Sequence, residues 1–260
     1  MPEGDTLVRT ADGLRPFLLG RRVTAASARA PGPQAERLVG ATVTAVEAAG
    51  KNLLIRFDNG LEVRTHLRMH GSWHRYRPGE RWRRPAARAR LVIEVPGSVA
   101  VCFDAPVVEL FEQRAEALHP SLSRLGPDLL RAGFEPTEAI RRLRDPARAG
   151  RSIAESLLDQ RALAGIGNEV KNEVLWEARV SPHAATREVD DATLRGLVDG
   201  ARVMLLAGAA TGRRPRRVHR RAGRSCPRCG TLIRVEHQGA DLPRLTFWCP
   251  HCQPDPGGHR

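Results

Sequence analysis

The chain has 260 residues, with 42 lysines and arginines against 29 aspartates and glutamates, and a formal net charge of +13. No apolar run is long enough to span a membrane and no basic-then-apolar leader opens the chain, so we expect a soluble, cytoplasmic protein that does not bind membranes. The charge favours an anionic partner, above all nucleic acid, although a ribosome-associated or merely basic protein would share it.

The chain opens with Pro2 and Glu3 after the initiator methionine. If Met1 is removed, Pro2 offers a secondary α-amine, and the reference pKa of an α-amine is about 7.7–8.0 against about 10.4 for lysine. A neutral amine can attack a sugar aldehyde carbon, and from a secondary amine the adduct is an iminium ion. The Glu3 carboxyl is one residue away and could move protons during that attack. Taken alone, the same residues are more simply interpreted as a plain chain start before a capped helix.

A helix should follow, because Leu7, Ala11, Leu14 and Leu18 recur at helical spacing. Asp5 or Thr6 can cap its first turn, and Gly20 can end it. Beyond Arg21 the pattern changes to short β-rich runs with turn residues between them, which is typical of a sandwich or barrel. The expected strands are 23–28, 41–47, 52–57, 61–66, 89–95 and 98–103.

Two local features refine this β-rich part. Asp58-Asn59-Gly60 separates two expected strands, and Asn-Gly predicts a hairpin with a type I′ turn. Cys102 falls within the last expected strand and is most simply a small core residue.

After Leu125-Gly126-Pro127, which we interpret as a linker between domains, the residue pattern becomes typical of helices. A glycine-bearing turn at 162–167 between two helical runs predicts a helix-turn-helix arrangement of the kind that binds DNA. Asn168 opens the helix after that turn, where it could contact a phosphate or simply cap the helix. The expected helices are 137–144, 153–160, 168–178 and 191–207.

The C-terminal part begins with an arginine-rich run, 213–224, which we expect to be solvated and flexible until DNA binds. Two CxxC pairs follow, formed by Cys226, Cys229, Cys249 and Cys252. This spacing indicates a four-cysteine zinc site, and because four thiolates fill a tetrahedron the zinc should be structural. Between the pairs, apolar and polar residues alternate, which predicts a β-hairpin with its turn at 237–239. Arg244 would lie at the start of the second strand.

Only two of the 42 basic residues are lysines, Lys51 and Lys171. In a chain that otherwise uses arginine, a lysine suggests a task that a guanidinium cannot perform, because arginine effectively never gives up its proton.

Together these motifs resemble the formamidopyrimidine-DNA glycosylase and endonuclease VIII family of DNA-repair enzymes. The resemblance covers essentially the whole chain. In the family's order it comprises Pro2-Glu3-Gly4, Gly50-Lys51, the segment 66–71 (HLRMHG), the segment 125–128 (LGPD), the segment 165–169 (GIGNE) and the finger segment 244–250 (RLTFWCP).

The resemblance implies catalytic roles for four residues. Pro2 corresponds to the Schiff-base nucleophile, and Glu3 to the acid that helps open the deoxyribose. Lys51 matches the lysine that assists β-elimination and contacts phosphate. Arg244 matches the finger arginine associated with δ-elimination and phosphate binding.

The resemblance also implies DNA-binding residues. His66, Arg124 and Asn168 fall where the family contacts the DNA backbone. Arg68, Met69 and His70 fall in the loop that fills the gap left by the extruded nucleotide, a role that suits a flexible apolar methionine. On spacing alone, ordinary core packing of Met69 would be the simpler interpretation.

Three departures from the family pattern stand out. Thr6 occupies a place where the family often has a second carboxyl, so that carboxyl's contribution is in doubt. The stretch 104–108 lacks the arginine and phenylalanine of the purine-directed branch, which favours the endonuclease VIII branch. The segment before Cys226 is short and leaves little room for a loop that covers the substrate.

The sequence therefore predicts an α+β fold in three parts. These are a catalytic β-sandwich domain with an N-terminal helix (1–120), a helical helix-two-turn-helix domain (121–212) and a four-cysteine zinc finger (213–260). We expect a monomeric, nucleoid-associated bacterial glycosylase and abasic-site lyase of base excision repair. It should bind damaged double-stranded DNA, remove oxidised bases, preferentially pyrimidines, and nick the strand by β,δ-elimination. The alternatives are a purine-directed enzyme of the same family and a non-catalytic protein that binds damaged DNA.

Overall fold

The computed structural model describes residues 2–239 and 243–255, and the chain divides into two compact units, 1–123 and 124–260. Within the described ranges, no helix combines the length and apolarity that crossing a membrane requires. Each unit has its own hydrophobic core.

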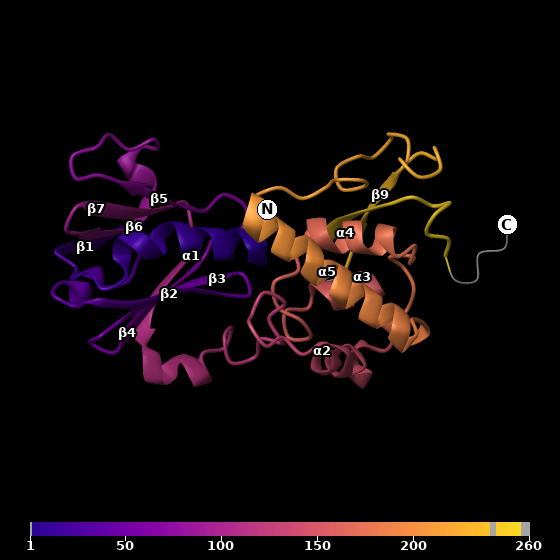
Figure 1. The fold of residues 1–260 in the computed structure, drawn as a ribbon, viewed down its shortest axis with the longest axis horizontal. Coiled ribbons are helices and arrows are strands. Elements are labelled where there is room, and N and C mark those ends of the chain that lie inside the picture. The colour runs from indigo at the N-terminus through magenta and orange to yellow at the C-terminus, as the bar shows by residue number, and fades with distance from the viewer. Residues whose placement is uncertain (1, 240–242, 256–260) are drawn as a thin grey trace. The chain divides into compact units, whose positions relative to one another are not determined.

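Two four-stranded antiparallel sheets form most of the first unit, which confirms the predicted sandwich (Figure 1). One sheet has the order β1 (Ala25–Ala28), β6 (Ala89–Val95), β7 (Ser98–Phe103), β5 (Ser72–Tyr76). The other has the order β2 (Val43–Ala49), β3 (Asn52–Phe57), β4 (Leu61–His66), β8 (Val107–Glu112). Short 3₁₀ turns lie at 35–38, 86–88 and 113–118.

The sequence pattern missed β5 and β8. Strand β5 reads Ser-Trp-His-Arg-Tyr and buries only Trp73 and Tyr76, so it shows no regular alternation. Strand β8 is half-buried along most of its length and gives no clear inward face. The predicted turn type was also wrong, because Gly60 has a positive φ of 77° and Asn59 does not. The connection 58–60 is therefore a three-residue loop with glycine in the left-handed region.

Helix α1 (Gly4–Leu18) packs against strands of both sheets and buries the predicted stripe of Leu7, Ala11, Leu14 and Leu18 in their shared core. Glu3, rather than Asp5 or Thr6, occupies the N-cap position. The backbone N–H of Glu3 donates to the Thr6 hydroxyl at 3.5 Å, as in a capping box. Gly20 follows the helix with a φ of 72°, as predicted. Cys102 is fully buried in this core, which confirms its predicted packing role.

The second unit contains α2 (Pro136–Leu143), α3 (Ile153–Leu158), α4 (Asn168–Glu177) and α5 (Asp191–Thr211), with short 3₁₀ turns at 146–148 and 186–188. The segment 125–127 packs within this unit, because the N–H of Gly126 donates to the carbonyl of Gln160 at 2.8 Å. A Cβ on Gly126 would lie only 2.6 Å from the backbone of Ala162, so glycine allows this close approach.

The zinc-finger hairpin pairs β9 (Arg234–Gln238) with β10 (Arg244–Trp248) in antiparallel register, Arg244 opposite Gln238. The predicted turn at 237–239 was placed too early, because His237 and Gln238 belong to β9. The connection between the strands includes 240–242, which lie outside the described residues.

Candidate active site and metal centre

The N-terminal residues are held by the start of α1. Glu3 is fully buried and Asp5 is 5% exposed, whereas Pro2 is half-buried. Thr6 is tied locally, since its N–H donates to the Asp5 carboxylate at 2.8 Å. Thr6 thus supports the helix start, and the buried Glu3 carboxyl follows Pro2 directly in the chain.

Helix α1 and strand β2 run in opposite directions, which brings Lys51 to the same end of the unit as Glu3. The N–H of Gly20 donates to the carbonyl of Val43 at 2.8 Å, and the Arg15 guanidinium donates to the carbonyl of Val46. From those contacts, about 18 Å of helix leads back to Glu3 and about 10 Å of strand leads on to Ala49, two residues before Lys51. The chain start and Lys51 therefore lie towards the same end of the unit.

His66 lies next to Lys51 across the hairpin, because it pairs with Asn52 in the β3–β4 register. Burial, together with the charges of Arg68, Lys51 and Arg64, lowers the pKa of His66 to about 4. The imidazole is therefore neutral at pH 7. Its Nδ1 accepts a hydrogen bond from the backbone N–H of Arg68 at 3.2 Å, which fixes the ring at the start of the following loop.

The loop after β4 presents its predicted DNA-binding side chains to solvent. Arg68, Met69 and His70 are all exposed, and Met69 is 51% exposed, so core packing is not its role. Arg68 adopts a left-handed φ of 49°, an uncommon conformation for a residue with a side chain. Gly71 ends the loop, and a Cβ there would lie 2.6 Å from the carbonyl oxygen of Leu67. A tight, glycine-dependent turn thus holds an exposed apolar side chain outward.

In the second unit the structure brings Asn168 and the finger hairpin together. The N-cap of α4 is Gly167, so the interpretation of Asn168 as a cap is wrong. Its side-chain amide instead donates to the carbonyl of Leu245 at 2.7 Å, beside Arg244. The Asn168 Oδ1 atom is buried and makes no hydrogen bond to the described residues. Arg124 is exposed at the start of the unit.

Sequence reasoning missed a row of buried polar side chains on α4: Glu169, Lys171, Asn172 and Glu173 are each at most 4% exposed. The Lys171 ammonium donates to the Thr246 hydroxyl at 2.7 Å, and that hydroxyl donates to Gln238 at 2.8 Å. Two signals were available: the scarcity of lysine, which singled out Lys171, and the density of polar residues in 168–173, which is also typical of a solvent-exposed helix face.

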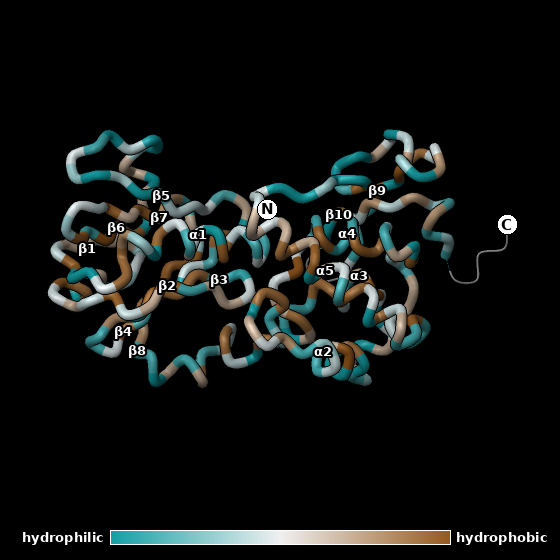
Figure 2. Tube along the Cα trace, viewed as in Figure 1, coloured by the Kyte–Doolittle hydropathy of each residue, from teal (hydrophilic) through white to brown (hydrophobic). Residues whose placement is uncertain are grey.

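The arginine-rich run is anchored, contrary to the expectation of a flexible segment. Glu169 forms ion pairs with Arg214 at 3.3 Å and Arg216 at 3.0 Å. The Glu173 carboxylate accepts the backbone N–H groups of residues 217, 218 and 219 at 2.7–3.1 Å. Figure 2 shows the run as a largely hydrophilic stretch after α5. Helix α4 therefore fixes the segment that leads into the finger.

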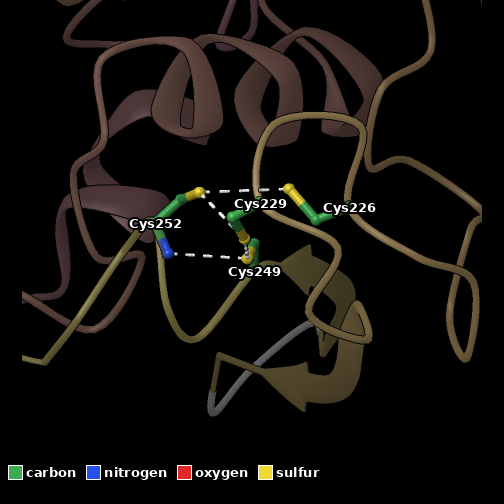
Figure 3. Close-up of side chains that lie close together, drawn as sticks. All are labelled: Cys226, Cys229, Cys249 and Cys252. Carbon is green, nitrogen blue, oxygen red and sulfur yellow. Dashed lines mark hydrogen bonds between the residues drawn. The ribbon is translucent and has the colours of Figure 1, made fainter.

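The four cysteines converge beside the hairpin (Figure 3). The sulfur–sulfur separations are 3.4 Å for Cys229–Cys249 and Cys229–Cys252, and 3.9 Å for Cys226–Cys252. Zinc–sulfur bonds of about 2.3 Å in a tetrahedron require sulfurs about 3.8 Å apart. The cluster therefore fits one structural zinc ion with four thiolate ligands and no position left for substrate.

The finger is docked on α4 through its metal site. The Trp176 indole N–H donates to the Cys226 sulfur at 3.4 Å, and the Arg228 guanidinium lies 4.1 Å from the centre of the Trp176 ring. The side chain of Gln253 accepts from the N–H of Cys249 and donates to the carbonyl of Val180. The zinc site thus sets the position of β10, and with it that of Arg244.

Three family models match the chain in order. They are the formamidopyrimidine-DNA glycosylase N-terminal domain (residues 1–106), the formamidopyrimidine-DNA glycosylase H2TH domain (125–218) and a zinc finger found in FPG and IleRS (225–254). Among solved structures, MutM in complex with DNA containing carbocyclic 8-oxo-G has a TM-score of 0.85 at 21% identity, covering 98% of this chain and 100% of that one. Lactococcus lactis Fpg in complex with DNA containing an oxidised pyrimidine has a TM-score of 0.84 at 21% identity, with the same coverage.

Curated relatives match at higher identity. A probable endonuclease 8 2 of Streptomyces coelicolor is 40% identical over 99% of this chain and 97% of its own length. The DNA-(apurinic or apyrimidinic site) lyase Nei2 of Mycolicibacterium smegmatis is 36% identical over 97% of this chain and 99% of its own length. The chain therefore belongs to the formamidopyrimidine-DNA glycosylase and endonuclease VIII family of DNA glycosylases and abasic-site lyases.

Proposed function

We propose that this enzyme acts in base excision repair on oxidised pyrimidines, using Pro2 as its nucleophile. The observation that carries the lesion preference is the connection between β7 and β8. It consists only of Asp104, Ala105 and Pro106, and contains neither arginine nor phenylalanine to intercalate as in the purine-directed branch. The two relatives named endonuclease 8 2 and Nei2 support the same branch.

The chemistry begins at the Pro2 nitrogen once Met1 has been removed. Its lone pair attacks C1′ of the extruded deoxyribose, and the bond from C1′ to the base breaks with its electron pair leaving on the base, which takes up a proton. The buried Glu3 carboxyl supplies a proton to the ring oxygen as the sugar opens. The product is an iminium ion that joins the Pro2 nitrogen to C1′.

The iminium ion then drives strand cleavage. Loss of a proton from C2′ pushes electrons towards the iminium, and the C3′–O bond breaks so that the 3′ phosphate leaves with the electron pair. A second elimination releases the 5′ phosphate in the same way, and water frees the amine. Lys51 is proposed to assist proton transfer and hold a phosphate in the first elimination, and Arg244 to hold a phosphate in the second.

The other proposed DNA contacts come from exposed side chains at Met69 and Arg124 and from half-buried ones at His66 and Asn168. The Met69 side chain would enter the stack where the nucleotide has left and offset a few kcal/mol of lost stacking. His66 is neutral and lies beside Lys51, and because its Nδ1 already accepts from Arg68, its Nε2–H can donate one hydrogen bond to a DNA backbone group. Arg124 and Asn168 are proposed to hold phosphates from the second unit.

Cleavage of a defined set of lesions tests the proposed preference. Duplexes would each carry one 5-hydroxyuracil, thymine glycol, 8-oxoguanine or formamidopyrimidine, opposite each of the four bases. We expect the two oxidised pyrimidines to be excised at least about tenfold faster, a difference of about 1.4 kcal/mol in barrier. Faster excision of the purines would assign the chain to the other branch. Binding without cleavage of any lesion or abasic site would make it a non-catalytic DNA-binding protein.

A further inference from the structure

One arginine links the loop that carries Met69 to the connection between β7 and β8. Arg84 lies in the arginine-rich segment 77–88, between β5 and β6. Its Nη1 atom donates to the carbonyl oxygen of His70 at 3.2 Å and forms an ion pair with Asp104 Oδ2 at 2.5 Å. One guanidinium therefore holds two loops that are far apart in sequence.

Asp104 is itself a fixed anchor for this arginine. Its second carboxylate oxygen accepts from Arg88 Nε at 2.7 Å, and its side chain is only 17% exposed. The residue adopts a left-handed φ of 55°, which turns the chain sharply between β7 and β8. The N–H of Asp104 donates to the carbonyl of Arg88 at 3.0 Å. With backbone and carboxylate both held, Asp104 offers Arg84 an acceptor in a constant place.

The two loops also approach each other so closely at Gly71 that a side chain there would clash. A Cβ built on Gly71 would lie 3.0 Å from the Cα of Ala105 and 2.6 Å from the carbonyl oxygen of Leu67. Arg84 thus donates a hydrogen bond to the loop at His70. The next residue, Gly71, lies directly against the connection 104–106. The side chains of Arg68, Met69 and His70 remain exposed to solvent, although the loop backbone is held at His70 and Gly71.

We infer that Arg84, anchored by Asp104, is a positioning residue that holds the Met69 loop ready to fill the gap in the DNA. This inference rests on the proposed gap-filling role of Met69. Met69 is 51% exposed, and a methionine side chain has three rotatable bonds, so the direction of its insertion depends strongly on the backbone that carries it. A loop ordered before binding avoids the cost of ordering it on the DNA.

The arrangement also bears on the short connection between β7 and β8, which has no arginine or phenylalanine of its own. Where the purine-directed branch places an arginine and a phenylalanine, this chain has Asp104-Ala105-Pro106, in which Ala105 is buried and Asp104 is held by two arginines. The arginine comes instead from 77–88 and acts on the backbone of the loop rather than on a base. The gap is then filled from one side, by Met69.

Four single variants and one double variant distinguish two roles of Arg84: positioning of the Met69 loop and simple attraction of DNA phosphates by its positive charge. Arg84→Ala removes the link, and Arg81→Ala is the matched control, because Arg81 is exposed in the same segment and makes no hydrogen bond or ion pair with the described residues. Asp104→Asn removes the anchor while raising the net charge by one. Met69→Ala removes the wedge itself, and Met69→Ala with Arg84→Ala tests whether the two act together.

Each variant would be measured in single turnover at saturating enzyme on two abasic substrates. One is an intact duplex, and the other has a one-nucleotide gap opposite the abasic site, so that no orphaned base needs support. A 2-aminopurine placed opposite the abasic site reports local unstacking. Arg84→Ala and Asp104→Asn should cleave the intact duplex about tenfold more slowly, with reduced fluorescence change, and the gapped duplex at nearly the wild-type rate. Arg81→Ala should match the wild type on both.

The double variant should be no more than about twofold slower than the slower single variant, because both substitutions disable the same step, the insertion of Met69 into the gap. Wild-type rates for Arg84→Ala on the intact duplex, with Met69→Ala slow, would overturn the inference and leave the proposed function standing. Wild-type rates for Met69→Ala would instead remove the proposed gap-filling role. Faster cleavage by Asp104→Asn would show that only the phosphate attraction of the arginines matters.

Discussion

The Lys171 ammonium donates a hydrogen bond to the Thr246 hydroxyl at 2.7 Å, and both residues are 1% exposed. This contact joins α4 to β10 two residues after Arg244. The two lysines of the chain therefore differ in kind. Lys171 is a buried attachment point for the finger, whereas Lys51 lies in the β2–β3 turn near His66.

Replacement of Lys171 by methionine should loosen the finger. The change leaves the buried Thr246 hydroxyl with one partner fewer, which costs about 1–3 kcal/mol. We expect a melting temperature lower by several degrees, faster loss of zinc to a chelator and weaker DNA binding. Calorimetry and zinc release measure these effects. Exposed Arg195→Met on α5 serves as the control, and equal zinc release in both variants would show that Lys171 does not hold the finger.

Replacement of Lys51 by arginine should preserve DNA affinity better than the cleavage rate. Lys51→Ala should slow excision and β-elimination, yet leave some covalent trapping on a preformed abasic site, because Lys51 is not the proposed nucleophile. Lys51→Arg restores the positive charge without a transferable proton. We therefore expect DNA affinity to recover more fully than the cleavage rate. A wild-type cleavage rate for Lys51→Arg would mean that position 51 needs only a positive charge.

Much of the fold could be predicted because its signals are local. Strands β3, β4, β6 and β7 are buried along most of their length and are rich in apolar residues, and α1 buries the predicted stripe. Strand β5 was missed because its few residues carry both buried aromatics and exposed polar groups. Local pattern specifies an element well only when one face of that element is uniformly buried.

The candidate site divides in the same way. Pro2, Lys51 and the cysteines could be selected by motif and spacing, and the cysteines do converge. The polar residues of α4 could not, because their partners lie 40 or more residues away, in the arginine-rich run and the finger. Arg84 could not be distinguished from the other arginines of its segment until the carbonyl of His70 and the carboxylate of Asp104 were placed beside it.

Loss of one zinc ligand should affect the second unit alone. Cys249→Ser should release zinc and weaken DNA binding, because a structural zinc site contributes folding free energy directly. The first unit has its own core and should keep its fold. Zinc content and circular dichroism check these effects, with Cys102→Ser as a control cysteine outside the metal site. Full cleavage activity in a zinc-free variant would contradict the assigned role of the finger.

Stability should fall in mild acid, in part through His66. Burial and nearby positive charges lower the pKa of His66 from 6.5 to about 4. Between pH 6.5 and 4 the unfolded chain therefore binds a proton at His66 that the folded chain does not bind, so stability decreases as the pH falls through that window. His66→Gln should show a smaller drop in melting temperature between pH 7 and pH 5 than the wild type. The exposed histidine variant His237→Gln is the control, and an equal drop in all three proteins would contradict the assignment.

The central claim is that the Pro2 nitrogen forms the covalent bond to the sugar. Borohydride added to enzyme and abasic-site DNA should reduce the iminium to a stable cross-link, and mass spectrometry after nuclease and protease digestion should find the sugar remnant on the N-terminal peptide, at Pro2. A chain extended by one residue ahead of Pro2 converts that amine into an amide and should trap no DNA. An adduct on Lys51, or undiminished trapping by the extended chain, would show that another amine is the nucleophile.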